Sequence, residues 1–297
     1  MVFRTLSVFF LVCCFLVHIP CESQWLKEKG SAYIKLNSWH LLADKHFTNM
    51  GSIDPNATRG LWINSLYFQY GLTKRLNLTG YIPFSVTAYQ FAQVSKTKGD
   101  ELLKRGSLSS FGDTELALEV GLFNYGNWAF SSSLKFSFPT GNSEGITDTD
   151  DEKLLEIGAS FQTGDGEFNL QPTFNMGTGY TIGQTPSYFK SNLGYNFRTE
   201  GFSDEVHIAL ENGFQFLDNR LLLLGAFHLT KSLKNGNREL RDDVSFFVDK
   251  LESLVARVET AFELFDHFGI SFGLAYPIWG RLGFQATSIS GGIYLDY

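Results

Sequence analysis

The chain has 297 residues and a formal net charge of −7, and it is rich in Phe (29), Tyr (12) and Gly (29) but poor in Met (3) and Pro (7). A negative charge without a basic stripe excludes a nucleic-acid-binding protein, which needs Lys and Arg to neutralise phosphates. Aromatic residues favour β-strands and glycine favours turns. The composition therefore predicts an all-β protein.

The first residues have the plan of a secretory signal peptide. Arg4 precedes an apolar run at 6–17, and Pro20 ends the run shortly before Ser23. An apolar run of about 12 residues is too short to cross a bilayer as a helix. We expect a signal peptide at 1–23 and one mature domain at 24–297. The alternative is a lipid attached to Cys21.

No membrane helix and no thiol chemistry is expected in the mature chain. The three cysteines (Cys13, Cys14 and Cys21) all lie in the signal segment. Without them there is no disulfide, no cysteine-ligated metal and no thiol nucleophile. After the signal segment, no apolar stretch approaches the roughly 18 residues that a membrane helix needs. A membrane protein with this sequence would have to be a β-barrel.

Apolar residues alternate with small or polar residues along the mature chain. At 115–122, Leu116, Leu118 and Val120 alternate with Glu115 and Glu119. Similar alternation occurs at 76–84, 128–138, 168–176, 206–216, 254–262 and 268–274. In a barrel, the apolar face contacts lipid and the other face lines the lumen. A soluble β-sandwich would show the same pattern, so alternation alone does not decide.

The links between the expected strands fall into two classes. Short links occur at 71–75, 124–127, 217–220 and 265–267, and long polar links at 41–59, 90–112, 139–165 and 232–250. Short periplasmic turns and longer external loops are typical of outer-membrane barrels. The links therefore favour a transmembrane antiparallel up-and-down β-barrel over the sandwich.

About 12 strands are expected. They lie at 31–40, 60–71, 75–89, 113–122, 128–138, 166–177, 188–198, 204–216, 221–231, 251–264, 268–276 and 284–297. A thirteenth strand at 154–162 would give an odd number, whereas single-chain bacterial barrels have even numbers. We therefore interpret 139–165 as one long external excursion, with a count of 10 or 14 strands left open.

The last strand carries a second signal. Ile289, Gly291, Ile293, Leu295 and the terminal Tyr297 share one face. An alternating apolar strand with a terminal aromatic residue resembles the signal by which barrels enter the outer membrane. We therefore expect a location in the cell outer membrane, with its lipids and the barrel assembly machinery as partners.

Several short segments resemble the MetA-pathway phenol-degradation family of outer-membrane proteins, which is grouped with transporters. They are 70–76 (Tyr-Gly-Leu-Thr-Lys-Arg-Leu), 111–116 (Phe-Gly-Asp-Thr-Glu-Leu), 138–141 (Phe-Pro-Thr-Gly), 163–166 (Thr-Gly-Asp-Gly), 194–198 (Gly-Tyr-Asn-Phe-Arg) and 204–205 (Asp-Glu). The resemblance spans most of the mature chain. It implies an outer-membrane barrel that passes small aromatic or apolar compounds, and it brings no catalytic residues.

Eleven ionisable residues fall on the polar face of the expected strands. They are Lys35, Glu115, Glu119, Lys135, Glu205, His207, Glu211, His228, Arg257, Glu259 and Glu263. Six carboxylates beside three Lys or Arg predict a lumen that favours cations or neutral polar solutes. Alternatively, these residues pair with one another in a filled lumen, as in small barrels.

These features predict a passive diffusion channel for a small-molecule solute, with no enzyme activity, cofactor or metal. Two alternatives remain: a structural or adhesion barrel with a filled lumen, and an outer-membrane hydrolase. A hydrolase would need a serine bonded to a histidine on the outer rim. A metal could bind if His207 and His228 met beside Glu205 or Glu211.

Aromatic residues at the expected strand ends predict the girdles at the two membrane surfaces. They are Trp39, Trp62, Trp128, Tyr276 and Trp279.

Overall fold

The computed structural model describes residues 26–55, 59–91, 93–94, 101–103, 105–144, 161–238 and 246–297. The predicted signal peptide at 1–23 lies outside the described residues. Among the described residues, no helix is long and apolar enough to cross a membrane.

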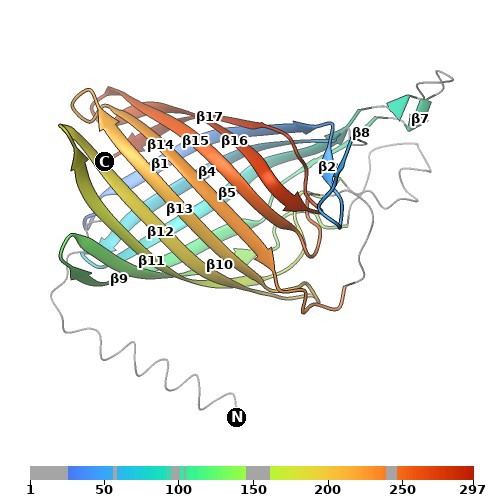
Figure 1. Ribbon diagram of the computed structural model, residues 1–297, viewed down its shortest axis with the longest axis horizontal. Coiled ribbons are helices and arrows are strands. Elements are labelled where there is room, and N and C mark those ends of the chain that lie inside the picture. The colour runs from blue at the N-terminus through green and yellow to red at the C-terminus, as the bar shows by residue number, and fades with distance from the viewer. Residues whose placement is uncertain are drawn as a thin grey trace, which may run out of the picture.

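Twelve long antiparallel strands close into a barrel (Figure 1). They are β1 (Ala32–Ala43), β4 (Arg59–Thr73), β5 (Leu76–Gln90), β9 (Thr114–Tyr125), β10 (Trp128–Phe138), β11 (Asn169–Ile182), β12 (Thr185–Arg198), β13 (Glu205–Phe216), β14 (Leu221–Ser232), β15 (Glu252–Phe265), β16 (Phe268–Arg281) and β17 (Ser288–Asp296). Each pairs with the barrel strands before and after it in the chain, and β1 pairs with both β4 and β17. Every barrel edge is therefore paired, as a membrane requires.

Five short strands lie outside the twelve. Strands β2 (His46–Phe47) and β3 (Ile53–Asp54) pair with each other, as do β6 (Gln93–Val94) and β7 (Glu101–Leu103). Strand β8 (Gly106–Ser110) pairs with the last part of β5, whereas β9 pairs with the first part. Strands β8 and β9 thus follow one another along the same edge of β5.

The barrel has one end with short links and one with long links. The links at the turn end are 74–75, 126–127, 183–184, 217–220 and 266–267, and those at the loop end are 44–58, 91–113, 139–168, 199–204, 233–251 and 282–287. Ala32 and Tyr297 hydrogen-bond each other's backbone at the turn end, where Figure 1 places the carboxy terminus. This is the division that the link lengths predict.

The two faces of the barrel wall differ in chemistry. Outward-facing residues of the middle strands are large and apolar, and several are about half exposed, such as Leu193 (54%), Phe227 (51%) and Val258 (55%). Their neighbours along each strand are small or polar and face the other way. An apolar outer surface of this extent is one that lipid covers.

The predicted strand plan is confirmed, with shifted ends. Strand β10 pairs directly with β11, so no barrel strand separates them, although 145–160 of the predicted excursion lies outside the described residues. The largest difference is the turn after β11. We expected a link at 178–187, but Gly183 and Gln184 alone make it, because the polar strand ends at 178–182 and 185–187 pair with each other.

Candidate functional site: the barrel lumen and its loop-end mouth

Ion pairs that reach over intervening strands identify the inner face. Lys35 Nζ on β1 lies 2.7 Å from Glu259 Oε1 on β15, although β16 and β17 separate these strands. Arg257 Nη2 on β15 lies 3.2 Å from Glu211 Oε2 on β13, across Ala226 of β14. Side chains can shorten such distances only on the concave side, so these residues lie inside the barrel.

The register places all eleven predicted residues on this inner face. Lys135 donates to Glu115 at 2.8 Å, and Glu119 accepts from Ser131 at 2.6 Å. Strand pairing places Glu205, His207 and His228 on the inner face, and Glu205 hydrogen-bonds His207 there. Glu263 lines a cavity inside the barrel. Whether these residues line a path for solutes stays a prediction.

Three inward-facing bases were missing from the predicted set. Arg59, Lys190 and Arg198 share the inner face with Ala43, Glu211 and Asn169 across their strand pairs. Together with the three predicted bases they match the six predicted carboxylates in number. Along the strands, the inward-facing acids and bases named here are therefore equal in number, and whether the lumen prefers cations stays a prediction.

Three cavities occupy the lumen and share tyrosines. The mid-lumen cavity, of about 480 Å³, is lined by Tyr33, Trp39, Tyr67, Tyr81 and Arg257 among others. Tyr67 also lines a cavity of about 320 Å³ against β9–β12, and Tyr33 also lines a cavity of about 600 Å³ at the turn end. The mid-lumen cavity thus shares Tyr67 with the cavity against β9–β12, and it shares Tyr33 with the cavity at the turn end.

Glycines let two inner tyrosines lie against the wall. A Cβ on Gly213 would stand 2.2 Å from the Tyr188 ring, and one on Gly269 would stand 2.2 Å from the Tyr294 ring. A ring that covers a glycine on the adjacent strand stabilises the sheet where glycine alone would weaken it.

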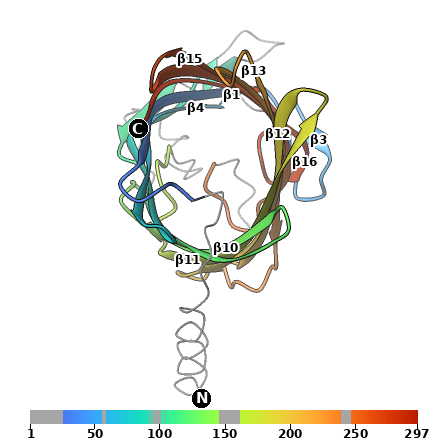
Figure 2. The same cartoon turned by 90° about the vertical axis from the view of Figure 1, so that its left-hand side faces the viewer.

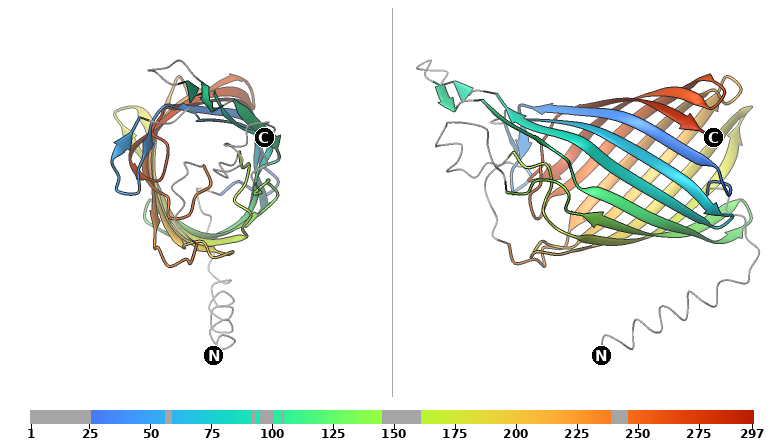
Figure 3. Two further views of the ribbon diagram at one scale, coloured as in Figure 1. Left: turned by 90° about the vertical axis from the view of Figure 1, so that its right-hand side faces the viewer. Right: turned by 180° about the vertical axis from the view of Figure 1, so that it is seen from behind.

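Apolar side chains gather inside the barrel at the loop end. Phe161 and Phe246 come from two long links and pack against the inner wall of β4 and β5, where Leu61 and Val86 are buried. A second cluster joins the same Phe246 to Phe284, with ring centroids 4.3 Å apart. We call these three phenylalanines and their wall contacts the mouth plug. Figures 2 and 3 show loop segments inside the ring of strands.

The mouth plug corrects one part of the predicted girdles. Trp39 packs against both apolar clusters and lines the mid-lumen cavity, so it faces inward. Trp62, Tyr276 and Trp279 are exposed on the outer surface at 50%, 41% and 39%. Trp39 was misassigned because an apolar residue at a strand end was expected to contact lipid, whereas here the inner wall itself is apolar.

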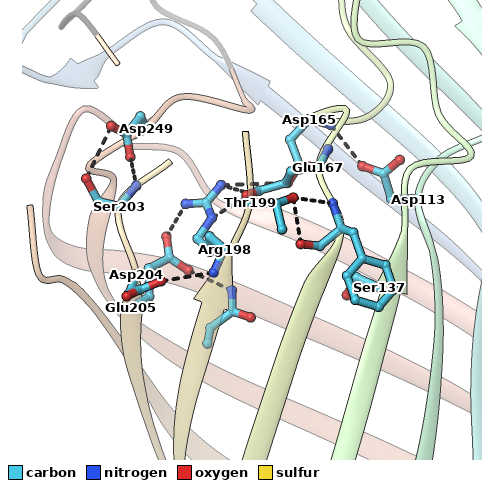
Figure 4. A network of polar contacts seen from close by, with 12 residues as sticks. Asp113, Ser137, Asp165, Glu167, Arg198, Thr199, Ser203, Asp204, Glu205 and Asp249 are labelled. Carbon is cyan, nitrogen blue, oxygen red and sulfur yellow. Dashed lines mark hydrogen bonds and ion pairs between the residues drawn. The ribbon is translucent and has the colours of Figure 1, made fainter. Parts of the chain in front are cut away.

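A buried polar network lies beside the mouth plug (Figure 4). The guanidinium of Arg198, at the end of β12, contacts Glu167, lies 2.7 Å from Glu205 and 3.7 Å from Asp165. Asp113 accepts hydrogen bonds from the backbone N–H of Gly141 and of Asp165, at 2.9 and 2.8 Å. We call Asp113, Asp165, Glu167, Arg198 and Glu205 the mouth network.

The mouth network joins short motifs that lie far apart in the sequence. Asp113, Gly141, Asp165, Arg198 and Glu205 belong to five of the six motifs behind the family resemblance. Only Glu205 was a predicted site residue. The contacts join two links, 91–113 and 139–168, to the end of β12 and the start of β13. The alternation of residues along a strand does not predict contacts of this kind.

Burial in the links changes how two network carboxyls titrate. Desolvation raises the pKa of Asp113 to about 6, and the nearby Asp165 acts in the same direction. Desolvation also raises the pKa of Glu167 to about 8, although Arg198 acts in the opposite direction. In this structure, both carboxyl groups thus hold their protons more strongly than they would in water.

The histidines do not form the arrangements that a metal or a hydrolase needs. His207 bonds to Glu205 at 3.0 Å, and the described residues contain no group of three His, Cys, Asp or Glu that could hold a metal. Outward-facing His40 bonds to the Tyr89 hydroxyl, while Ser38 accepts from Trp62. Within the described part of the chain, no serine hydrogen-bonds a histidine.

A closed barrel of twelve antiparallel strands, apolar outside and polar inside, is a transmembrane β-barrel of the outer-membrane type. The predicted fold class is thereby confirmed, and the fold agrees with the predicted location in the cell outer membrane.

Comparisons with known proteins agree with this class. No family model and no curated protein matches the chain. Among solved structures, the chain is similar to the COG4313 outer membrane channel from Pseudomonas putida F1, with a TM-score of 0.60 and 13% identity over 94% of this chain and 99% of that chain. At this identity the likeness shows the fold alone.

Two further barrels are less similar. LpxR from Salmonella typhimurium has a TM-score of 0.46 and 10% identity over 89% of this chain and 100% of that chain. The β domain of the Bordetella autotransporter BrkA has a TM-score of 0.45 and 8% identity over 91% and 100%. Likenesses of this size do not bear on function.

Proposed function

We propose that the protein is a passive diffusion channel for small solutes across the outer membrane, with no enzymatic step. The observation that carries the proposal is the series of cavities along the lumen, which meet at Tyr33 and Tyr67. The similar fold of the COG4313 outer membrane channel from Pseudomonas putida F1 supports it. The eleven predicted residues and the three further bases would line the path.

The mid-lumen cavity has groups that a solute could use. The polar side chains of Asn37 and Arg257 line this cavity, while Trp39, Tyr67 and Tyr81 offer ring faces. These contacts suit a small apolar or aromatic solute with a polar substituent, which the resemblance to the phenol-degradation family also favours.

A structural or adhesion barrel with a filled lumen is the second candidate. The ion pairs of the lumen and the mouth plug favour it, because paired charges and packed rings close space. Planar-bilayer recording of the refolded mature chain distinguishes the two. We expect discrete conductance steps, and uptake of small solutes into liposomes. A closed baseline across a wide voltage range, without uptake, would favour the filled barrel.

The balance of lumen charges leads to a prediction on selectivity. Because Arg59, Lys190 and Arg198 balance the predicted carboxylates, the channel should separate cations from anions only weakly. A reversal potential close to zero is expected in a potassium chloride gradient. A large reversal potential with the sign of a cation-selective channel would instead support the preference for cations that the sequence predicts.

Tyr67 should restrict the path, because it borders two of the three cavities. Tyr67→Ala removes that boundary and should increase single-channel conductance. Tyr70→Ala is the matched control, since Tyr70 lies on the same strand, faces outward and is 41% exposed. Equal conductance of the two variants would show that ions do not pass Tyr67.

The terminal strand suggests the remaining partner. We infer that the barrel assembly machinery recognises β17, where Ile289, Ile293, Leu295 and Tyr297 form an exposed outer row. Tyr297 also closes the seam, since its backbone pairs with that of Ala32. Comparing membrane insertion in cells with refolding in pure lipid separates recognition from simple stability.

A further inference from the structure

We propose that segment 161–167 is a gate over the lumen, and that the carboxyls of the mouth network hold it shut in acid and release it as the pH rises. The inference rests on the proposed channel function, because it names how the same lumen is regulated. It concerns only the described residues of this link.

The gate segment is held in place by contacts along its length. Phe161 is 1% exposed and packs on the inner wall of β4 and β5. Thr163 donates its N–H to the carbonyl of Asn142 at 2.9 Å, and its hydroxyl accepts from the Asn142 N–H at 2.8 Å. Glu167 contacts Arg198 at the opposite end. The segment therefore lies inside the mouth, where Phe161 shares an apolar cluster with Trp39, a residue that lines the mid-lumen cavity.

The ties at the network end contain more acid than base. Asp165, Glu167 and Glu205 lie against one guanidinium, that of Arg198, and Asp113 adds a fourth carboxyl through its contact with the Asp165 backbone. The side chain of Glu167 is fully buried, and its Oε2 atom has no partner. Backbone N–H groups and Arg198 stabilise the ionised forms of Asp113 and Glu167 in part, but burial of the two carboxyls outweighs them, so the segment in place favours protonated carboxyls.

Other charged groups face the network from the elements packed on it. His207 of β13 hydrogen-bonds Glu205, and Asp204, just before β13, accepts from the backbone N–H of Arg198. Asp249 accepts from the backbone N–H of Ser203 and pairs with Lys250, and the guanidinium of Arg238 stacks on the Phe202 ring. These groups have partners outside the gate segment, whereas the guanidinium of Arg59 on β4, which stays charged, lies 5.9 Å from the ring centroid of Phe161. The response of the gate to pH therefore depends on Asp113 and Glu167.

The sign of the pH dependence follows from the direction of the shifts. A group whose pKa is raised on docking stabilises the docked form at low pH, and this contribution is lost as the pH rises through the raised value. For Asp113 the loss occurs between its ordinary value and about 6, and for Glu167 it extends to about 8. The gate should thus be closed at pH 5 and open more often at pH 9.

Conductance of the refolded mature chain tests the gate, with equal pH on both sides of the bilayer. Open probability should rise between pH 5 and pH 9. The double variant with Asp113→Asn and Glu167→Gln keeps both groups uncharged, so it should stay at the acid level at pH 9. Asp266→Asn is the control, because this carboxyl is exposed in the link 266–267 at the turn end, outside the cavities, and it should keep the response. A pH response unchanged in the double variant would overturn the proposal.

A second measurement does not depend on conductance. The mature chain is expected to lack cysteine, so Phe161→Cys gives a single thiol that a maleimide can label only when the segment leaves the wall. Phe111→Cys, at an exposed position, corrects for the reactivity of the thiol itself. The corrected labelling rate should rise at least about tenfold from pH 5 to pH 9, since one pKa unit changes an equilibrium tenfold.

The two measurements separate the gate from the channel. A corrected rate that does not change with pH sinks the gate, whatever the conductance. A rate that rises while the bilayer stays closed supports movement of the segment and overturns the channel. Labelling that rises equally in the double variant would also overturn the proposal, because other groups would then control the segment.

Discussion

Leu193→Arg should destabilise the barrel in lipid by about 2–4 kcal/mol, the range measured for a base on the lipid face near the bilayer midplane. Leu193 lies near the middle of β12, faces outward and is 54% exposed. The charge would be placed in hydrocarbon, where no water can solvate it. The free energy of unfolding in lipid vesicles, obtained from urea titration, measures the effect.

The neighbouring residue gives a matched control. Asn192 lies on the inner face and lines the cavity of about 320 Å³, so Asn192→Arg places the same charge in a polar lumen. We expect little loss of stability there. Equal losses for the two variants would contradict the assignment of inner and outer faces.

The strands could be predicted because each carries its own signal. A strand with one apolar face shows a period of two, and this pattern located all twelve barrel strands. The requirement for an even number of strands removed a strand at 154–162. The ends were less accurate where alternation fades, as at Thr178 and Thr181 of β11, because their pairing with β12 depends on the partner strand.

The missing bases could have been found by the same reasoning. In the segment predicted at 188–198, Phe189, Leu193 and Phe197 share one face, which places Lys190 and Arg198 on the other. The alternation of residues in this segment therefore already predicts that Lys190 and Arg198 face inward. Arg59 was harder to predict, because it lies just before the expected start of its strand.

The mouth plug could not be predicted from the sequence. Phe161 and Phe246 lie in links that were expected to be polar, Phe284 was placed at the start of the last expected strand, and no period marks any of them as inward-facing. Leu61 and Val86 belong to strands whose inner face is polar further toward the turn end, as at Tyr67 and Thr79. Only the folding of the links into the barrel gives these apolar residues a partner.

Arg198→Met should cost about 3–5 kcal/mol of folding stability at neutral pH, the usual cost of removing one partner from a buried ion pair. Arg198 is 6% exposed, and its removal leaves the carboxylate of Glu205, 2.7 Å away, without its cation. The methionine keeps most of the apolar length of the side chain, so the loss reports mainly the charge.

The control is a second lumen ion pair, and the pH supplies a further check. Lys135 and Glu115 are 30% and 35% exposed, so Lys135→Met should cost only about 0–1 kcal/mol. At pH 5 the carboxyls left by Arg198→Met can take up protons, which lowers the cost of burying them. The loss for Arg198→Met should therefore be smaller at pH 5 than at pH 8. An equal loss at both values would mean that Arg198 acts through packing on Phe202, whose ring centroid lies 4.4 Å from the guanidinium, and not through its charge.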